Sequence, residues 1–141
     1  MVTAIQCKEK WGDPELESGM KLWIVPQEMT ILIPEIPRKI YCNALMIEPL
    51  KAAFNNLIDE GLQEEVKTWD GCFNIRKKKG QLTMSLHSWG LAIDLNAAWN
   101  RMGQTPTLSA EFVQCFKDSG FDWGGDWKSP DGMHFQISKI S

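Results

Sequence analysis

The chain has two histidines, His87 and His134, and each lies in a short glycine-containing segment that also holds a carboxylate. Asp94 follows His87 in the first segment, and Asp131 precedes His134 in the second. Two imidazoles and one carboxylate can hold a Zn²⁺ ion and leave its fourth position open to water. The pattern predicts a site for one Zn²⁺ per chain, with His87, Asp94 and His134 as ligands and Asp131 as a second, non-ligating acid.

Such a site predicts hydrolysis. An open Zn²⁺ site lowers the pKa of its bound water from about 16 to roughly 7. Asp131 is then the candidate general base, which takes the proton of the water and passes it to the leaving amine. The oxyanion needs a second positive group, for which Arg76 is our candidate. An exposed arginine at the end of a strand is an equally good interpretation of Arg76 from the sequence alone.

Each of these residues also has an ordinary structural interpretation, because a single histidine or aspartate on a strand is usually a hydrogen-bonded structural residue. Their joint occurrence in two short segments favours the metal site. Ser85 either binds a substrate group or orients the loop of His87, and we favour the second role. Trp89 and Trp127 lie close to the two segments in sequence and are further candidates for contact with substrate.

The elements around the first segment are predicted to form a strand and a bend. Residues Leu91–Leu95 alternate in character, which is typical of a strand, and Asp94 lies on the face opposite the large apolar side chains. A carboxylate in such a strand needs a partner. Gly90 permits a bend that brings His87 over this strand. We expect His134 on the neighbouring strand, after a turn that holds Asp131.

The remaining pattern predicts an α+β fold, with an antiparallel sheet and helices packed on one side. Apolar spacing predicts two helices, at 49–58 and 110–118, the second with Ser109 as N-cap. The other expected elements are a loop-rich arm with a short helical turn at 1–19, strands at 20–25, 72–76 and 131–137, a β-rich run at 30–33, and turn regions at 77–81 and 121–127.

Length and composition bound the classes of function. With 141 residues and a formal net charge of -3, we expect one domain, residues 1–141, that acts as a monomer and binds no nucleic acid. Lys77–Lys79 is the only dense basic run and is interpreted as an exposed turn. No apolar run predicts a membrane span or a secretory signal, so we expect a protein made in the cytoplasm with its four cysteines free and buried.

The two segments resemble the motifs of the M15 family of zinc peptidases. Ser85–Asp94 matches S-x-H-x-x-G-x-A-x-D, and Asp131–Phe135 matches D-x-x-H-F, in the same order. The resemblance covers about residues 70–137 and implies a fold like that of the hedgehog domain and the DD-peptidases. It implies the same three ligands, a catalytic role for Asp131, where many relatives have Glu, and a functional arginine at Arg76.

The resemblance also implies a substrate, the stem peptides of bacterial peptidoglycan. The region at 123–127 looks like that of phage members, which favours an endolysin-type enzyme that is made in the host cytoplasm and cuts between L-Ala and D-Glu. A D,D-carboxypeptidase that removes terminal D-Ala is the first alternative, and a non-catalytic, zinc-stabilised binding module is the second. Residues 1–69 are expected to complete the same domain and shape the choice of substrate.

Overall fold

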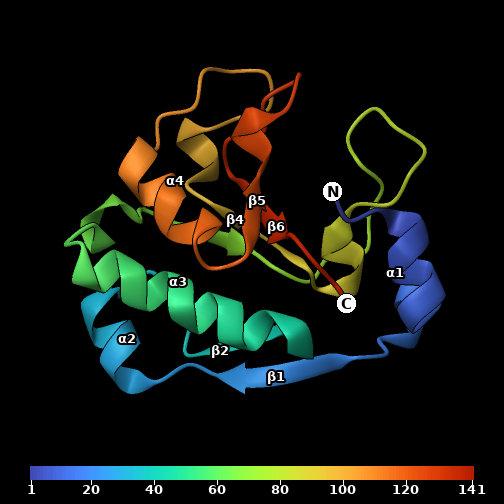
Figure 1. Ribbon diagram of the computed structural model, residues 1–141, viewed down its shortest axis with the longest axis horizontal. Helices are drawn as coiled ribbons and strands as arrows, with labels where there is room; N and C mark the ends of the chain where they lie inside the picture. Colours follow the sequence, from blue (N-terminus) through green and yellow to red (C-terminus); the bar gives the residue numbers. More distant parts are fainter.

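The computed structural model describes residues 1–141 and contains four α-helices and two antiparallel sheets, an α+β fold as expected (Figure 1). The larger sheet has the strand order β3-β4-β6-β5. Its strands are β3 (Trp69–Gly71), β4 (Ala92–Leu95), β5 (Phe121–Trp123) and β6 (His134–Ile137). The smaller sheet pairs β1 (Met20–Ile24) with β2 (Lys39–Asn43).

The helices are α1 (Ala4–Trp11), α2 (Gln27–Leu32), α3 (Ile47–Asp59) and α4 (Ala110–Lys117). In Figure 1, α3 lies between the β1–β2 ribbon and the half of the molecule that contains α4 and the larger sheet. None of these helices has the length and hydropathy needed to cross a membrane.

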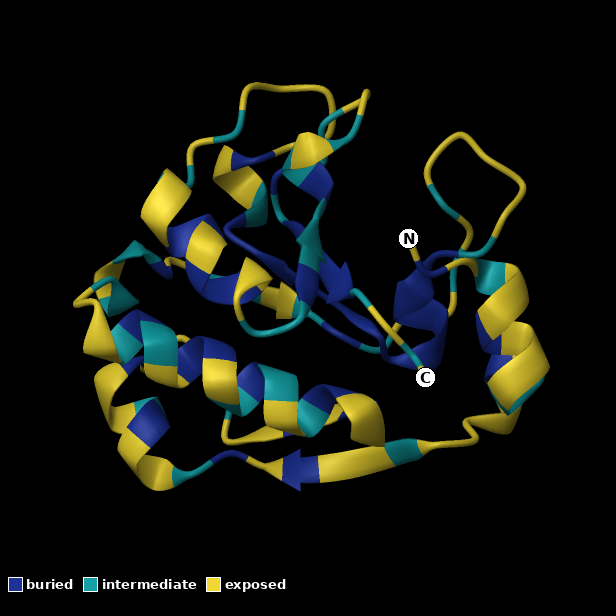
Figure 2. Ribbon diagram, in the orientation of Figure 1, coloured by how far each residue is buried: buried dark blue, intermediate teal, exposed yellow.

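The two predicted amphipathic helices are confirmed. The buried face of α3 consists of Leu50, Ala53, Phe54 and Leu57. In α4 the Ser109 hydroxyl accepts a hydrogen bond from the Phe112 amide at 3.1 Å, a cap that contributes about 1 kcal/mol. The buried stripe of α4 faces the core, whereas its opposite side is exposed (Figure 2).

One hydrophobic cluster of 29 buried residues extends from Val2 to Ile137 and includes side chains of both sheets. On β6, Phe135 packs against Phe116 of α4, with ring centroids 4.4 Å apart. Phe135 lies between His134 and Gln136 in the strand, so its side chain points to the face opposite theirs. The aromatic core therefore holds β6 from one face and leaves His134 and Gln136 on the other. All four cysteines are free and buried, as expected.

Three local predictions were wrong. The β-rich run at 30–33 forms the end of α2, a short helix between Pro26 and Pro34 whose C-cap, Ile33, donates its amide to the Met29 carbonyl. Residues 1–19 hold more than a helical turn, because Thr3 and Gln6 form a reciprocal capping box that starts α1. The region at 121–127, expected to be only a turn, contributes β5 as an edge strand.

The expected strand at 72–76 is also absent from the sheet, whose edge is β3 instead. The backbone of this segment bonds the first motif: the Asn74 amide donates to the His87 carbonyl at 3.1 Å, and the Arg76 carbonyl accepts from the Ser85 amide at 2.9 Å. Beyond it, Lys77 and Met84 form an isolated antiparallel bridge. The backbone groups of this segment therefore bind the loop of His87 and do not extend the sheet.

Candidate metal centre and active site

Sheet register places two of the predicted ligands together. Asp94 on β4 and His134 on β6 are direct partners in the antiparallel pair. Their side chains point to the same face, and Asp94 Oδ1 lies 3.5 Å from His134 Nδ1. The predicted neighbouring strand for His134 is therefore confirmed.

The third side chain comes from a 3₁₀ turn, Leu86–Trp89, which begins after Ser85 and ends at Gly90. The Ser85 hydroxyl accepts a hydrogen bond from the His87 amide at 3.3 Å, which fixes the start of the turn. Gly90 has φ +67°, and a Cβ there would come within 2.7 Å of the Asn43 backbone nitrogen. Only glycine fits this bend, which places His87 Nε2 3.2 Å from Asp94 Oδ2.

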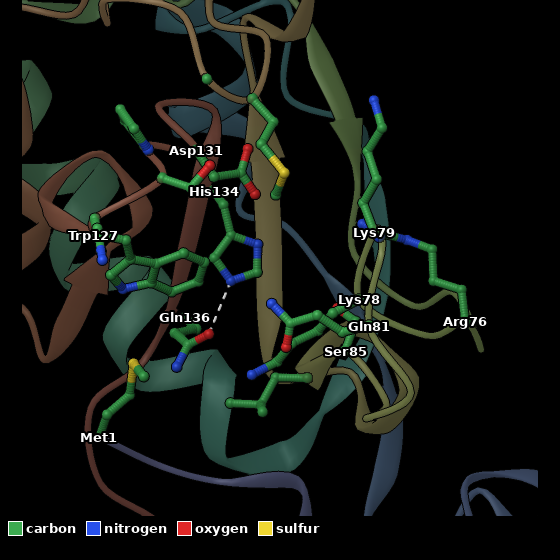
Figure 3. Close-up of a pocket in the computed structure, with 16 residues that line it drawn as sticks. Met1, Arg76, Lys78, Lys79, Gln81, Ser85, Trp127, Asp131, His134 and Gln136 are labelled. Atoms are coloured by element: carbon green, nitrogen blue, oxygen red, sulfur yellow. Dashed lines mark hydrogen bonds between the residues drawn. The ribbon is translucent and has the colours of Figure 1, made fainter.

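Hydrogen bonds on the far sides of the rings fix the orientation of both imidazoles. His87 Nδ1 lies 2.6 Å from the Cys72 carbonyl oxygen, which can only accept, so Nδ1 carries the proton. His134 Nε2 lies 2.9 Å from Gln136 Oε1 and donates to it (Figure 3). The remaining ring nitrogens, Nε2 of His87 and Nδ1 of His134, present lone pairs toward Asp94, as the ligands of a metal do.

The arrangement has buried donor atoms without partners. His87 Nε2 and Asp94 Oδ1 are buried and make no hydrogen bond. A buried lone pair and a buried carboxylate oxygen that have no hydrogen-bond partner are costly unless a nearby cation satisfies them. One donor atom from each of His87, Asp94 and His134 lies within 4.8 Å of the others. The site therefore fits a divalent cation held by two imidazoles and a carboxylate.

Asp94 is suited to bind a cation because it is ionised. Burial, at 8% exposure, opposes ionisation, but hydrogen bonds from the imidazoles of His134 and His87 in their protonated forms hold the pKa of its carboxyl well below the usual range, and a cation bound by the deprotonated ring nitrogens would take over that role. Arg76 Nη2 lies 3.6 Å from Asp94 Oδ2, with the guanidinium half-exposed. Arg76 thus stands beside the cluster, although it lies on an irregular segment rather than on the expected strand.

Asp131 lies in the turn before β6, as predicted. Its amide donates to the Gly124 carbonyl at 2.9 Å, and its carbonyl accepts from the His134 amide at 3.1 Å. Burial raises the pKa of the Asp131 carboxyl; His134 opposes this rise and Asp94 adds to it. Asp131 is not part of the three-residue donor cluster. Its position and raised pKa suit a proton carrier.

The centre opens into a cavity of about 800 Å³ lined by 16 residues. In Figure 3, Trp127, Asp131 and His134 lie on one side, and Arg76, Lys78 and Lys79 lie across from them. The Trp127 and His134 rings have centroids 5.1 Å apart. His87 and Asp94 do not line the cavity, so His134 is the one member of the cluster that borders it.

The structure separates the three residues expected to contact substrate. Trp127 and Ser85 line the cavity, and the Ser85 hydroxyl is bonded to the loop of His87. Trp89 is 4% exposed, lies outside the cavity, and donates its Nε1–H to the Gly12 carbonyl at 2.9 Å. This placement argues against the substrate contact expected of Trp89 and gives it a structural role.

Two sets of cavity residues were missed in the sequence. Gln136 is two positions after His134 on the same strand, and this spacing alone predicts that both side chains share a face. Lys78 was interpreted as part of an exposed turn, but it is half-buried and lines the cavity together with Lys79 and Lys128. Lys128 is far from Lys78 and Lys79 in the sequence, and only the fold brings the three side chains to one cavity, so no local sequence pattern could have connected them.

In a comparison with known proteins, part of the chain matches the model of one protein family. Residues 78–137 match the family model described as D-alanyl-D-alanine carboxypeptidase, an M15 peptidase family. The match includes both motifs and confirms the resemblance to the M15 peptidases. None of the curated proteins compared with the chain matches it.

Proposed function

We propose that this protein, whose residues 78–137 carry the M15 peptidase sequence, is a zinc endopeptidase that cuts peptidoglycan stem peptides between L-Ala and D-Glu. One observation carries the proposal. The lone pairs of His87 and His134 converge on the ionised Asp94 next to a cavity that also holds Asp131. Two imidazoles and one carboxylate suit Zn²⁺ among the common divalent ions.

His87, Asp94 and His134 would hold the ion, which when bound polarises the scissile carbonyl and lowers the pKa of the attacking water. Asp131 takes the proton of that water and delivers it to the amine nitrogen as the C–N bond breaks. Its raised pKa suits this transfer, because a carboxylate of higher pKa is a stronger base toward the water. Arg76, beside Asp94 and on the cavity wall, donates hydrogen bonds to the developing oxyanion.

The cavity favours the endopeptidase over the D,D-carboxypeptidase that the family description names. A volume of about 800 Å³ is near the upper end for small-molecule sites, and it accommodates several residues of a stem peptide on both sides of the cut. Trp127 provides an apolar surface for them along one wall. The non-catalytic module is disfavoured because Asp131, with its raised pKa, would have no role in it.

Mass spectrometry of fragments from purified peptidoglycan tests the proposal. New N-terminal D-Glu ends are expected, whereas release of free D-Ala would indicate the carboxypeptidase. Asp131→Ala is the matched control, since it removes the proposed base and leaves the three ligands in place. Unchanged peptidoglycan after incubation with zinc-loaded protein would contradict both peptidase functions and favour the binding module.

The proposed setting is phage lysis, in which the protein is made as a monomer in the host cytoplasm and reaches the wall when the membrane is permeabilised. Turbidity measurements on permeabilised and intact bacteria address this setting. Loss of turbidity is expected only after permeabilisation. Lysis of intact cells by added protein would contradict it for bacteria with an outer membrane.

A further inference from the structure

The cavity has a charge opposite to that of the whole protein. The chain has a formal net charge of -3, yet the cavity lining contains four basic side chains and a single acidic one, Asp131. The basic side chains are those of Arg76, Lys78, Lys79 and Lys128. Cavities lined by one sign of charge concentrate ligands of the other sign. The lining therefore selects for an anionic ligand.

Arg76 has a carboxylate nearby in Asp94, but the three lysines have none. Lys78, Lys79 and Lys128 take part in no ion pair, although other lysines and Arg76 form four such contacts. The carboxylate nearest to Lys128 in sequence, Asp126, is bound by Lys117 at 2.7 Å. We call Lys78, Lys79 and Lys128 the lysine rim.

The fold holds the rim at the cavity. The Lys78 amide donates to the Thr83 carbonyl at 2.8 Å, which closes the loop that carries Lys78 and Lys79. Lys128 follows directly after Trp127 in the chain and lines the same cavity. Lys78 is half-buried and forms no ion pair with an acidic side chain. A bound anion in the cavity would supply a counter-charge.

We propose that the lysine rim binds a free carboxylate on the leaving-group side of the scissile bond and makes the enzyme selective for it. This inference rests on the proposed peptidase function. In a stem peptide the chain continues from D-Glu through its γ-carboxyl group, so the α-carboxylate of D-Glu stays free on the carbon next to the scissile nitrogen. Conversion of this group to an amide removes the charge and keeps the size, which makes the α-amide the discriminating substrate.

Two matched peptides test the rim: L-Ala-γ-D-Glu-L-Lys, and the same peptide with the α-carboxylate as an amide. The wild-type protein should cut the acid with a kcat/KM higher by roughly two- to fivefold, the range expected for partly exposed charge pairs. The preference should shrink as salt is added, because salt screens such pairs. Lys78→Gln combined with Lys79→Gln, and separately Lys128→Gln, should lower the ratio of acid to amide cleavage toward one.

Lys77→Gln is the control, since Lys77 is exposed, adjacent to Lys78 and outside the cavity lining. It should keep the full preference, and zinc content and thermal unfolding of each variant show that the fold is intact. Equal cleavage of acid and amide by the wild-type protein would contradict carboxylate binding by the lysine rim, whereas the peptidase function would still hold. An undiminished preference in both rim variants would also contradict carboxylate binding by the rim. If neither peptide nor purified peptidoglycan is cut, the peptidase function fails and the rim fails with it.

Discussion

Asp94 and His134 face each other across β4 and β6, so the register of one strand pair places a carboxylate oxygen 3.5 Å from an imidazole nitrogen. A slip of one residue in this register would move one of the two side chains to the opposite face of the sheet. The packing of Phe135 on the other face opposes such a slip. Two of the three proposed ligands are thus positioned by the sheet itself, and only His87 depends on a loop.

We expect the purified protein to bind one Zn²⁺ per chain, measured by metal analysis after dialysis. Zinc should raise the thermal unfolding temperature, because at a hundredfold excess over Kd a ligand stabilises the fold by about 2.7 kcal/mol, and EDTA should reverse the rise. His87→Ala should lose both the zinc and the shift. Folded protein with no affinity for zinc would contradict the metal site.

Asp131→Ala should keep its zinc and lose hydrolysis by roughly a hundredfold or more, the usual contribution of a general base. Asp131→Glu keeps a carboxylate and should retain a large part of the activity. Both are measured as kcat/KM on a stem peptide with metal content as the control. Full activity in Asp131→Ala would remove Asp131 from the mechanism.

The pH profile should reflect the environment of Asp131. Burial raises the pKa of its carboxyl, and the base must be ionised to accept a proton, so activity should rise with pH through a value above the usual carboxyl pKa of about 3.9. Because the pKa of Asp131 is higher in the folded protein than in the unfolded chain, the folded state binds the proton of this carboxyl more tightly. The contribution of Asp131 to the free energy of unfolding is therefore present at low pH and is lost as the pH rises through its folded pKa. An acid limb at or below pH 3.9 in kcat/KM would contradict the assignment.

Arg76→Ala should lower kcat by about a hundredfold with a smaller effect on KM, since the oxyanion develops only in the transition state. Arg76→Lys should recover part of the loss. Arg101→Ala, an exposed arginine that does not line the cavity, serves as the control. Equal losses in kcat from Arg76→Ala and Arg101→Ala would assign no oxyanion role to Arg76.

Gln136→Leu should weaken zinc binding by about 10- to 100-fold, because His134 loses the acceptor that fixes its tautomer. Gln136→Glu keeps an acceptor and should restore affinity. Competition with a chelating dye gives the Kd, and ¹⁵N shifts of the His134 ring report its tautomer. A Gln136→Leu protein with wild-type affinity and an unchanged tautomer would show that Gln136 does not position His134.

Strong periodic patterns made the core of the fold predictable. The apolar spacing of α3 and α4, the Ser109 cap and the strands with Asp94 and His134 all follow from local sequence. Helix α2 was missed because two prolines and its own hydrogen bonds outweigh the β-propensity of Ile31 and Ile33. The contact of Trp89 with Gly12 and the position of Lys128 depend on pairs far apart in the chain, which periodicity does not reveal.

The loop of His87 depends on residues outside the segment that matches the family. Its imidazole is oriented by the Cys72 carbonyl, the Gly90 carbonyl accepts from the Asn43 amide at 3.0 Å, and the Trp89 indole reaches Gly12. Residues 78–137 alone therefore do not contain all the groups that hold the loop of His87 in place. A transfer of the proposed metal site into another scaffold, or a chimera between relatives, would have to include the backbone around Asn43 and Cys72 along with the motifs.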